Sequence, residues 1–168
     1  LPSHTPTYGV EGGCSTGSMA LHGAFKDIAS GAVDISLAVG VDKTFAPEDP
    51  VGMMGLFAGG LDQLDPEAWQ AFYAAQAEAA GCTWSPHPAR ITLLDICSLQ
   101  AEHHMKTHGT TQAQIAASAS KNHTHGSLNP KAQYQTPMTV EEVLADKAVV
   151  GPLTRAMCAP IGDGSAAA

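Results

Sequence analysis

The clearest periodic pattern lies near the start of the chain and predicts a helix over residues 15–30. Its apolar residues recur at spacings of three and four, which places them on one face, and Gly31 follows where a C-terminal cap belongs. Residues 35–41 form a short, almost wholly apolar run, which is typical of a strand covered on both faces. With the strand-like residues 8–10, these segments predict an α/β fold built on a β-α-β unit in a mainly parallel sheet.

From residue 44 the pattern changes to a mainly helical excursion of roughly a hundred residues, and an insertion of that length is usually functional. The Gly- and Met-rich residues 44–64 predict a loop. Start and stop signals predict helices over residues 66–80, 92–107, 111–126 and 140–146, the last opened by a capping box at Thr139 and Glu142, and residues 147–161 are expected to be mostly irregular. The expected domains are therefore residues 1–44, the inserted helical residues 45–160, and a returning strand in residues 161–168.

Composition narrows the class of protein. The 168 residues are 44% hydrophobic and 14% charged, with a mean hydropathy of −0.02, which argues against intrinsic disorder. No apolar run approaches the ~20 residues of a membrane span, and no secretory signal is visible. The net charge is −8 and the basic residues are spread singly, so the sequence offers no patch for a nucleic-acid backbone.

Four cysteines without a Cys-x-x-Cys pair indicate reduced thiols in an intracellular protein rather than a disulfide framework or a zinc site. A cytoplasmic location is expected, or a peroxisomal one in a eukaryote. The first residue is not methionine, and the last residues read as the opening of a strand, so we expect the sequence to be a piece of a longer polypeptide.

Cys14 is the candidate nucleophile. It stands at a Gly-rich strand-to-helix turn, where unpaired backbone N–H groups and the positive end of the helix dipole favour thiolate over thiol. Gly12, Gly13 and Gly17 are expected to leave room for a substrate, and backbone N–H groups could stabilise an oxyanion. On local physics alone, a small residue filling a tight turn explains Cys14 equally well. Neither Gly-x-Gly-x-x-Gly nor Gly-x-x-x-x-Gly-Lys-Ser/Thr is present, so the turn is not predicted to bind a dinucleotide or a nucleotide phosphate.

The chain resembles the thiolases, most closely the sterol-carrier-protein-x type that includes bacterial lipid-transfer-protein thiolases. The resemblance rests on segments that occur in family order: Gly13-Cys14-Ser15-Thr16-Gly17-Ser18-Met19-Ala20-Leu21, residues 35–43, Lys121-Asn122-His123-Thr124-His125-Gly126, Pro152-Leu153-Thr154 and Met157-Cys158-Ala159-Pro160-Ile161-Gly162-Asp163-Gly164. The family's usual Cys-x-Ser reads Cys14-Ser15-Thr16 here, which fits this subgroup.

The resemblance implies a thiolase-like fold with an inserted loop domain, and an acyltransferase of lipid metabolism and β-oxidation that acts on acetyl-CoA and 3-oxoacyl-CoA thioesters. Cys14 would carry the covalent acyl group. Coenzyme A would be a substrate, with no covalently bound cofactor and no metal, and a homodimer or a partner with an OB fold and zinc ribbon is implied. The family's second-half motifs, Cys-x-Gly and Gly-His-Pro, do not occur in this sequence, so we expect the 168 residues alone to be inactive.

Weaker candidates lie in the insertion. His104 and Met105 are similar to family residues beside the pantetheine arm, where a soft thioether packs well, and Lys121, Lys131 or Arg155 could offset the anionic coenzyme. The remaining features are interpreted as structural: His87 between two prolines, Cys158 as a buried inert thiol, and the helix histidines 103, 104 and 108, which lack a zinc motif.

Three alternatives to thiolysis remain open from the sequence. The chain could be a non-catalytic subunit that binds acyl-CoA or assembles with a partner. It could be a relative that cleaves sterol side-chain CoA esters by retro-aldol chemistry, although Cys14 favours thiolysis. A ketosynthase-like condensing enzyme shares the turn but would lack the Asn122-His123 run and the long helical insertion.

Overall fold

The computed structural model describes residues 4–61 and 65–168. The chain divides into two compact units: Leu1–Glu48 with Ile161–Ala168, and Asp49–Pro160. We call them unit 1 and unit 2 and describe each by itself. Helices predominate in both, with two small sheets, which is consistent with the predicted α/β class.

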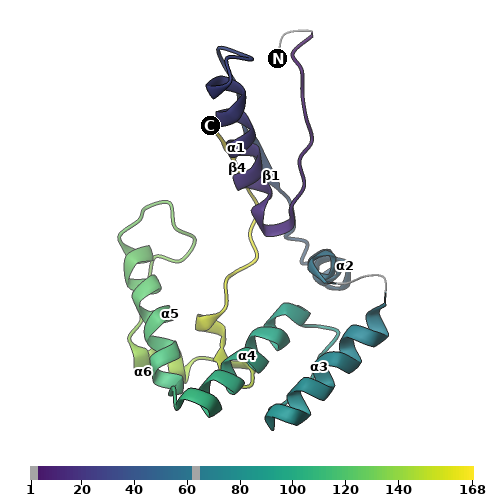
Figure 1. Ribbon diagram of the computed structural model, residues 1–168. Helices are drawn as coiled ribbons and strands as arrows, with labels where there is room; N and C mark the ends of the chain where they lie inside the picture. The colour runs from purple at the N-terminus through teal and green to yellow at the C-terminus, as the bar shows by residue number, and fades with distance from the viewer. Residues whose placement is uncertain (1–3, 62–64) are drawn as a thin grey trace. The chain divides into compact units, whose positions relative to one another are not determined.

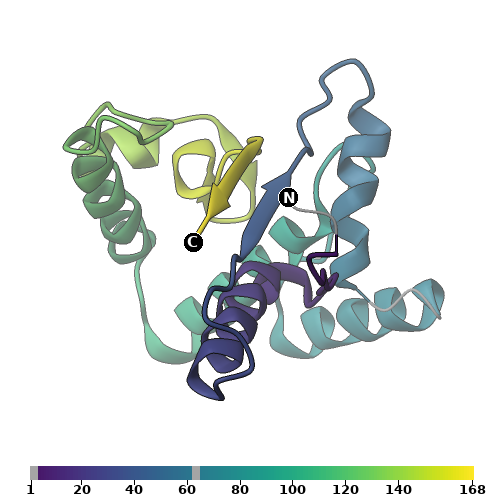
Figure 2. The ribbon, with the colours of Figure 1, turned by 90° about the horizontal axis from the view of Figure 1, so that it is seen from above.

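Unit 1 contains a 3-10 turn η1 (Gly13–Ser15), helix α1 (Thr16–Ala29) and strands β1 (Val39–Asp42) and β4 (Gly164–Ala167). The two strands lie side by side and antiparallel, with Val39 opposite Ala167 and Asp42 opposite Gly164 (Figures 1 and 2). Helix α1 packs against β1 and ends as predicted, with Gly31 in the left-handed conformation at φ 72°.

The parallel β-α-β pairing predicted for this unit is not formed within the described residues. Residues 8–10 are not a strand, and β1 starts four residues later than predicted. A strand needs a partner for its backbone groups, and the described partner of β1 is the antiparallel β4, not residues 8–10. The predicted cover on both faces is also absent, since Val39 and Val41 are 56% and 74% exposed. Among the described residues of unit 1, none is buried.

The two stretches of unit 1 between which unit 2 is inserted are joined by Asp163. Its Oδ1 accepts hydrogen bonds from the amides of Thr44 (2.8 Å) and Phe45 (2.7 Å), and its Oδ2 lies 2.8 Å from Lys43 Nζ. Lys43 also donates to the carbonyl of Phe45. The hydrogen bond from Lys43, followed by those from the two amides, lowers the pKa of Asp163 to about 2. One carboxylate therefore fixes the entry and exit of the insertion.

Unit 2 is mainly helical, with a short hairpin near its end. Its elements are α2 (Pro50–Leu56), η2 (Phe57–Gly60), α3 (Pro66–Ala80), α4 (Thr92–His108), α5 (Gln112–Ser127), α6 (Val140–Ala145), β2 (Ala148–Val150), β3 (Leu153–Thr154) and η3 (Arg155–Met157). The predicted loop over residues 44–64 is wrong for residues 50–60, which are helical because Asp49 caps a helix opened by Pro50. Residues 62–64 of that prediction lie outside the described residues.

Local signals explain where the helices of unit 2 begin and end. The Asp65 carboxylate accepts a hydrogen bond from the amide of Ala68, and α3 ends at Gly81 in the left-handed conformation. Thr111 and Thr139 each open a capping box, with Gln114 and Glu142 as the reciprocal partners. The irregular course predicted for residues 147–161 is wrong for the β2–β3 hairpin.

The core of unit 2 is small. Among the described residues, the buried apolar side chains are Met53, Ala77, Ile96, Leu99, Ala116, Val143 and Leu153. Thr154 is buried with them and donates from Oγ1 to the carbonyl of Val143 (2.7 Å), which ties β3 to α6. Among the residues that the structure describes, no helix combines the length and the apolar character needed to cross a membrane.

We predict that Asp163→Asn destabilises the chain at neutral pH and that this effect fades in acid. The pKa of Asp163 in the fold lies below the ~3.9 of an unfolded aspartate. The stabilisation is therefore complete above the unfolded pKa and is lost as the pH falls from about 4 towards 2. Urea unfolding of both proteins between pH 7 and pH 2 measures it. Asp34→Asn, at an exposed carboxylate without an ion pair among the described residues, is the control; a difference between Asp163→Asn and wild type that does not depend on pH would contradict the prediction.

Candidate active site

Cys14 lies at the centre of the 3-10 turn η1, directly before α1. The amide of Ser15 donates to the carbonyl of Gly12 (3.1 Å), and the amide of Thr16 donates to that of Gly13. Gly13 has φ 57°, a left-handed conformation that favours glycine. The side chain of Cys14 is exposed and its thiol is free. The turn therefore presents the sulfur to solvent at the amino end of a 14-residue helix.

A carboxylate that the sequence analysis did not single out holds this turn. Glu11 Oε1 accepts hydrogen bonds from the amides of Gly12 (2.9 Å) and Gly13 (2.7 Å) and from Thr16 Oγ1 (2.8 Å). The hydroxyl of Thr16, followed by the amides of Gly13 and Gly12, lowers the pKa of Glu11 below its ordinary value. The signal available in the sequence was an acid three residues before a helix-opening cysteine, separated from it by two glycines.

This network reduces the number of backbone donors that an oxyanion could use. Glu11 takes the amides of Gly12 and Gly13, and those of Ser15 and Thr16 close the turn. Within the residues that the structure describes, the amide of Cys14 donates no hydrogen bond. Of the amides of residues 12–16, that of Cys14 is therefore the one left without a hydrogen-bond acceptor among the described residues.

The glycines around Cys14 differ in the space beside them. A Cβ on Gly13 or Gly17 would meet no atom within 4 Å, in line with the expected room for a substrate. A Cβ on Gly12 would collide with Met19 Sδ, so the expectation of open space is wrong there. Met19 also lines an open groove of about 350 Å³ along α1, together with Ser18, His22 and Lys26.

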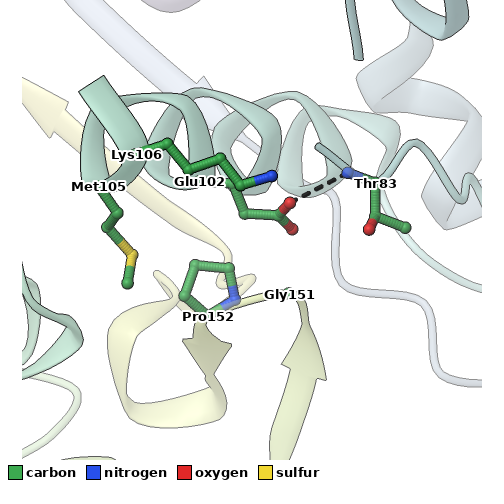
Figure 3. A pocket seen from close by; sticks show the side chains of 6 residues that line it. All are labelled: Thr83, Glu102, Met105, Lys106, Gly151 and Pro152. Atoms are coloured by element: carbon green, nitrogen blue, oxygen red, sulfur yellow. Dashed lines mark hydrogen bonds between the residues drawn. The ribbon is translucent and has the colours of Figure 1, made fainter. Parts of the chain in front are cut away.

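Unit 2 has its own open cavity, of about 370 Å³, which Met105 lines. The other lining residues are Thr83, Glu102, Lys106, Gly151 and Pro152 (Figure 3). The amide of Thr83 donates to Glu102 Oε2 (3.0 Å), and Lys106 Nζ donates to the carbonyl of Gly81. Two of the lining side chains, those of Glu102 and Lys106, thus tie the loop after α3 to α4 beside this cavity.

The two residues predicted to flank a pantetheine arm, His104 and Met105, lie in different surroundings. Met105 lines the cavity, whereas His104 is exposed and its ring lies 4.6 Å from that of His108, centroid to centroid. His104 is not among the residues that line the cavity. Across residues 4–61 and 65–168, no three His, Cys, Asp or Glu side chains gather as a metal site would require.

An ion pair with a buried carboxylate lies near the start of α4. Asp95 is 1% exposed, and its Oδ1 accepts hydrogen bonds from Nε (3.0 Å) and Nη2 (2.5 Å) of Arg90. Arg90 also donates to the carbonyls of Ser85 (2.6 Å) and Val149 (3.4 Å). One guanidinium therefore joins the loop before α4, α4 itself and strand β2.

His87 and Cys158, which the sequence analysis interprets as structural, and also His123, form hydrogen bonds within unit 2. His87 Nδ1 accepts a hydrogen bond from the amide of Ala89 (3.1 Å) within its turn. His123 donates from Nε2 to the carbonyl of Ala156 (3.1 Å) and stacks on Tyr134. Cys158 is half-buried rather than fully buried, and burial, followed by the nearby Cys97, raises the pKa of its thiol.

The three candidate cations differ in availability. Arg155 pairs with Asp146 through two hydrogen bonds, Nη2 to Oδ1 (2.7 Å) and Nε to Oδ2 (3.2 Å). This pairing lowers the pKa of Asp146 and raises that of Arg155. Lys121 and Lys131 are exposed and form no ion pair among the described residues.

Comparison with known proteins places these features in a family. Residues 1–151 match the thiolase N-terminal domain, so the chain belongs to the thiolase family. It is 33% identical to the acetyl-CoA acetyltransferase of Methanothermobacter thermautotrophicus over 162 residues, which cover 96% of this chain and 36% of the relative.

Two further relatives also match almost the whole of this chain but only part of their own length. The benzoylsuccinyl-CoA thiolase subunit BbsB of Thauera aromatica is 28% identical over 98% of this chain and 36% of its own length. Sterol carrier protein 2 of Bos taurus is 30% identical over 97% of this chain and 27% of its own length. The chain thus spans about a third of the length of the curated relatives that it matches.

We predict that Gly151→Ala destabilises unit 2 more than Gly109→Ala does. Both glycines have positive φ, 48° and 69°, so both variants carry backbone strain of roughly 1 kcal/mol. At Gly151 the new Cβ would also collide with Ser98 Oγ and lie 2.6 Å from Glu102 Oε1, whereas at Gly109 it would meet nothing within 4 Å. The clash adds about 1–3 kcal/mol. Urea unfolding of the two variants measures the difference, and equal losses of stability would contradict the close approach of Gly151 to α4.

Proposed function

We propose that this chain supplies the nucleophile of a thiolase-type acetyl-CoA acyltransferase, with Cys14 as the residue that becomes acylated. The observation that carries the proposal is the exposed, free thiol of Cys14 at the amino end of α1, in a chain of the thiolase family. The names of the two archaeal relatives, both acetyl-CoA acetyltransferases, support the same substrate class.

The proposed reaction has two halves: the acyl group is first transferred to Cys14 and then to coenzyme A. The Cys14 thiolate attacks the C3 carbonyl carbon of a 3-oxoacyl-CoA, and the C2–C3 bond then breaks. The electron pair goes to C2, which takes a proton and leaves as acetyl-CoA. The thiol of a second coenzyme A attacks the acyl-Cys14 thioester, which releases the shortened acyl-CoA and restores Cys14. The base that moves these protons is expected from a second half of the enzyme.

Binding of the acyl-CoA would draw on unit 2. Met105 offers a soft thioether in an open cavity, and the exposed Lys121 and Lys131 are cations without an ion-pair partner among the described residues. His104 remains a weaker proposal because it does not line this cavity. Arg155 is less suited to phosphate binding, since Asp146 already neutralises it. For the whole protein we propose a dimeric enzyme of β-oxidation that is located in the cytoplasm, or in the peroxisome of a eukaryote.

A second candidate function is a subunit of a larger assembly. It is favoured by the relative named as a thiolase subunit, BbsB. In that case the chain binds acyl-CoA or a partner protein, such as one with an OB fold and zinc ribbon, and Cys14 is not acylated. A retro-aldol variant that acts on sterol side-chain CoA esters would likewise leave Cys14 without a covalent role.

We predict that iodoacetamide modifies Cys14 faster than Cys97 at neutral pH. Both thiols are exposed, but Cys97 lies inside α4, away from a helix amino end, so the backbone environments of the two thiols differ. Mass spectrometry of tryptic peptides after timed labelling measures the two rates, with Cys14→Ser as the assignment control. Equal, slow labelling of both cysteines would favour the subunit function over catalysis.

We also predict that the 168-residue chain alone does not turn over a 3-oxoacyl-CoA. Acylation needs a base and a second thiol, and the Gly-His-Pro and Cys-x-Gly motifs that supply them in the family do not occur here. In the enzyme that contains this chain, Cys14→Ser should lower kcat by roughly 10³-fold or more, because the nucleophile is removed. Loss of the enolate absorbance of the 3-oxoacyl-CoA measures both. Robust thiolysis by the chain alone would show that it contains its own base.

A further inference from the structure

The hydrogen bonds around Glu11 form a closed network on the turn that carries Cys14. Besides donating to Glu11, the hydroxyl of Thr16 accepts a hydrogen bond from the amide of Gly12 (2.9 Å) and lies 2.8 Å from the carbonyl oxygen of Gly13. Glu11 and Thr16 therefore hold the two residues before Cys14 from both sides. In a unit without buried described residues, this network, rather than packing, fixes the turn.

We propose that Glu11 is a positioning residue for Cys14, acting together with Thr16 as a carboxylate–hydroxyl clamp on the amides of Gly12 and Gly13. The proposal rests on the proposed function, in which Cys14 is the nucleophile. The clamp keeps Gly13 in its left-handed conformation and leaves the amide of Cys14 without a hydrogen-bond acceptor among the described residues. Glu11 is not itself a catalytic residue.

The clamp has an electrostatic consequence. A carboxylate three residues before the sulfur opposes its ionisation, whereas the helix amino end favours it. The hydrogen bonds from Thr16, Gly13 and Gly12 favour the charged form of Glu11 and lower its pKa. Removing the charge of Glu11 therefore tests whether this carboxylate acts on the sulfur as well as on the shape of the turn.

Other ionisable groups lie on the segment before the turn, on α1 and on β1. They are His4 and Tyr8 on the segment before the turn, His22, Lys26 and Asp27 later on α1, and Asp42 on β1, which packs against α1. None of them forms an ion pair with Glu11 among the described residues. Substitutions at residues 11 and 16 leave all of them unchanged, so their contribution is the same in every variant.

The experiment compares Glu11→Gln, Glu11→Ala, Thr16→Val and Thr16→Ser with the unmodified chain. Glu11→Gln keeps an oxygen acceptor but removes the charge, and Thr16→Ser keeps the hydroxyl. The first readout is the pH dependence of Cys14 labelling by iodoacetamide. The second is hydrogen exchange of the Gly12 and Gly13 amides by NMR. Glu141→Gln, at an exposed carboxylate of α6 without a hydrogen bond or ion pair among the described residues, controls for the change in net charge.

The clamp predicts a different result for each variant. Glu11→Gln lowers the midpoint of the labelling profile by about half a pH unit, because an anion near the thiolate is removed. Glu11→Ala speeds exchange of the Gly12 and Gly13 amides about tenfold, the equivalent of one charge-assisted hydrogen bond. Thr16→Val speeds exchange of the Gly12 amide, which donates to the Thr16 hydroxyl. Thr16→Ser and Glu141→Gln behave as the unmodified chain.

Other outcomes overturn the proposal. A midpoint that Glu11→Gln does not move shows that Glu11 is structural only, and amides that stay protected in Glu11→Ala show that it does not hold the turn. Failure of the clamp can be distinguished from failure of the proposed function of Cys14. Slow, unselective labelling of Cys14 in the unmodified chain removes its catalytic role, while the midpoint and the amide exchange still report on the clamp.

Discussion

The candidate site depends on the binding of one carboxylate to successive backbone amides. In a turn as tight as residues 11–16, the amides point in nearly the same direction and repel each other unless an acceptor lies between them. Glu11 is that acceptor, and with it in place Gly13 can keep a positive φ and Cys14 can remain exposed at the start of α1. The same helix end that makes the sulfur a candidate thiolate thus also binds an anion from its own chain.

Much of the helical structure could be predicted from the sequence because its signals are local. A capping side chain, a proline at the first position and a glycine at the end act within a few residues of each other, as Asp65, Pro66 and Gly81 do in α3. The same chemistry opens α2 at Asp49, but the glycines and methionines of residues 51–60 masked it, since their spacing has no helical period.

Strand pairing could not be predicted in the same way because it depends on partners far along the chain. The apolar character of residues 35–41 indicates a strand that requires cover, yet it does not say which strand pairs with it or what covers it. In the structure β1 pairs with β4, more than a hundred residues later, and both are exposed. For the site, the residue type and its glycine neighbours indicated Cys14. The role of Glu11 is visible only once the turn brings its oxygen to two amides, and the separation of Met105 from His104 only once α4 turns them to different faces.

The two units differ in what holds them, and the difference explains where the charged residues lie. Unit 2 has a buried core, and the ion pair of Arg90 with the buried Asp95 joins three segments around α4. Unit 1 has no buried described residue, and at two places in it a carboxylate binds a pair of neighbouring amides: Glu11 binds those of Gly12 and Gly13, and Asp163 binds those of Thr44 and Phe45. Hydrogen bonds to an ionised acceptor are the stronger kind, and they fix a backbone conformation without needing apolar cover. The apolar side chains of α1 and β1 then stay exposed in this chain, which spans about a third of the length of its relatives. The conformation of the Cys14 turn therefore depends on local polar contacts, and we expect it to be maintained whether or not those apolar faces are covered.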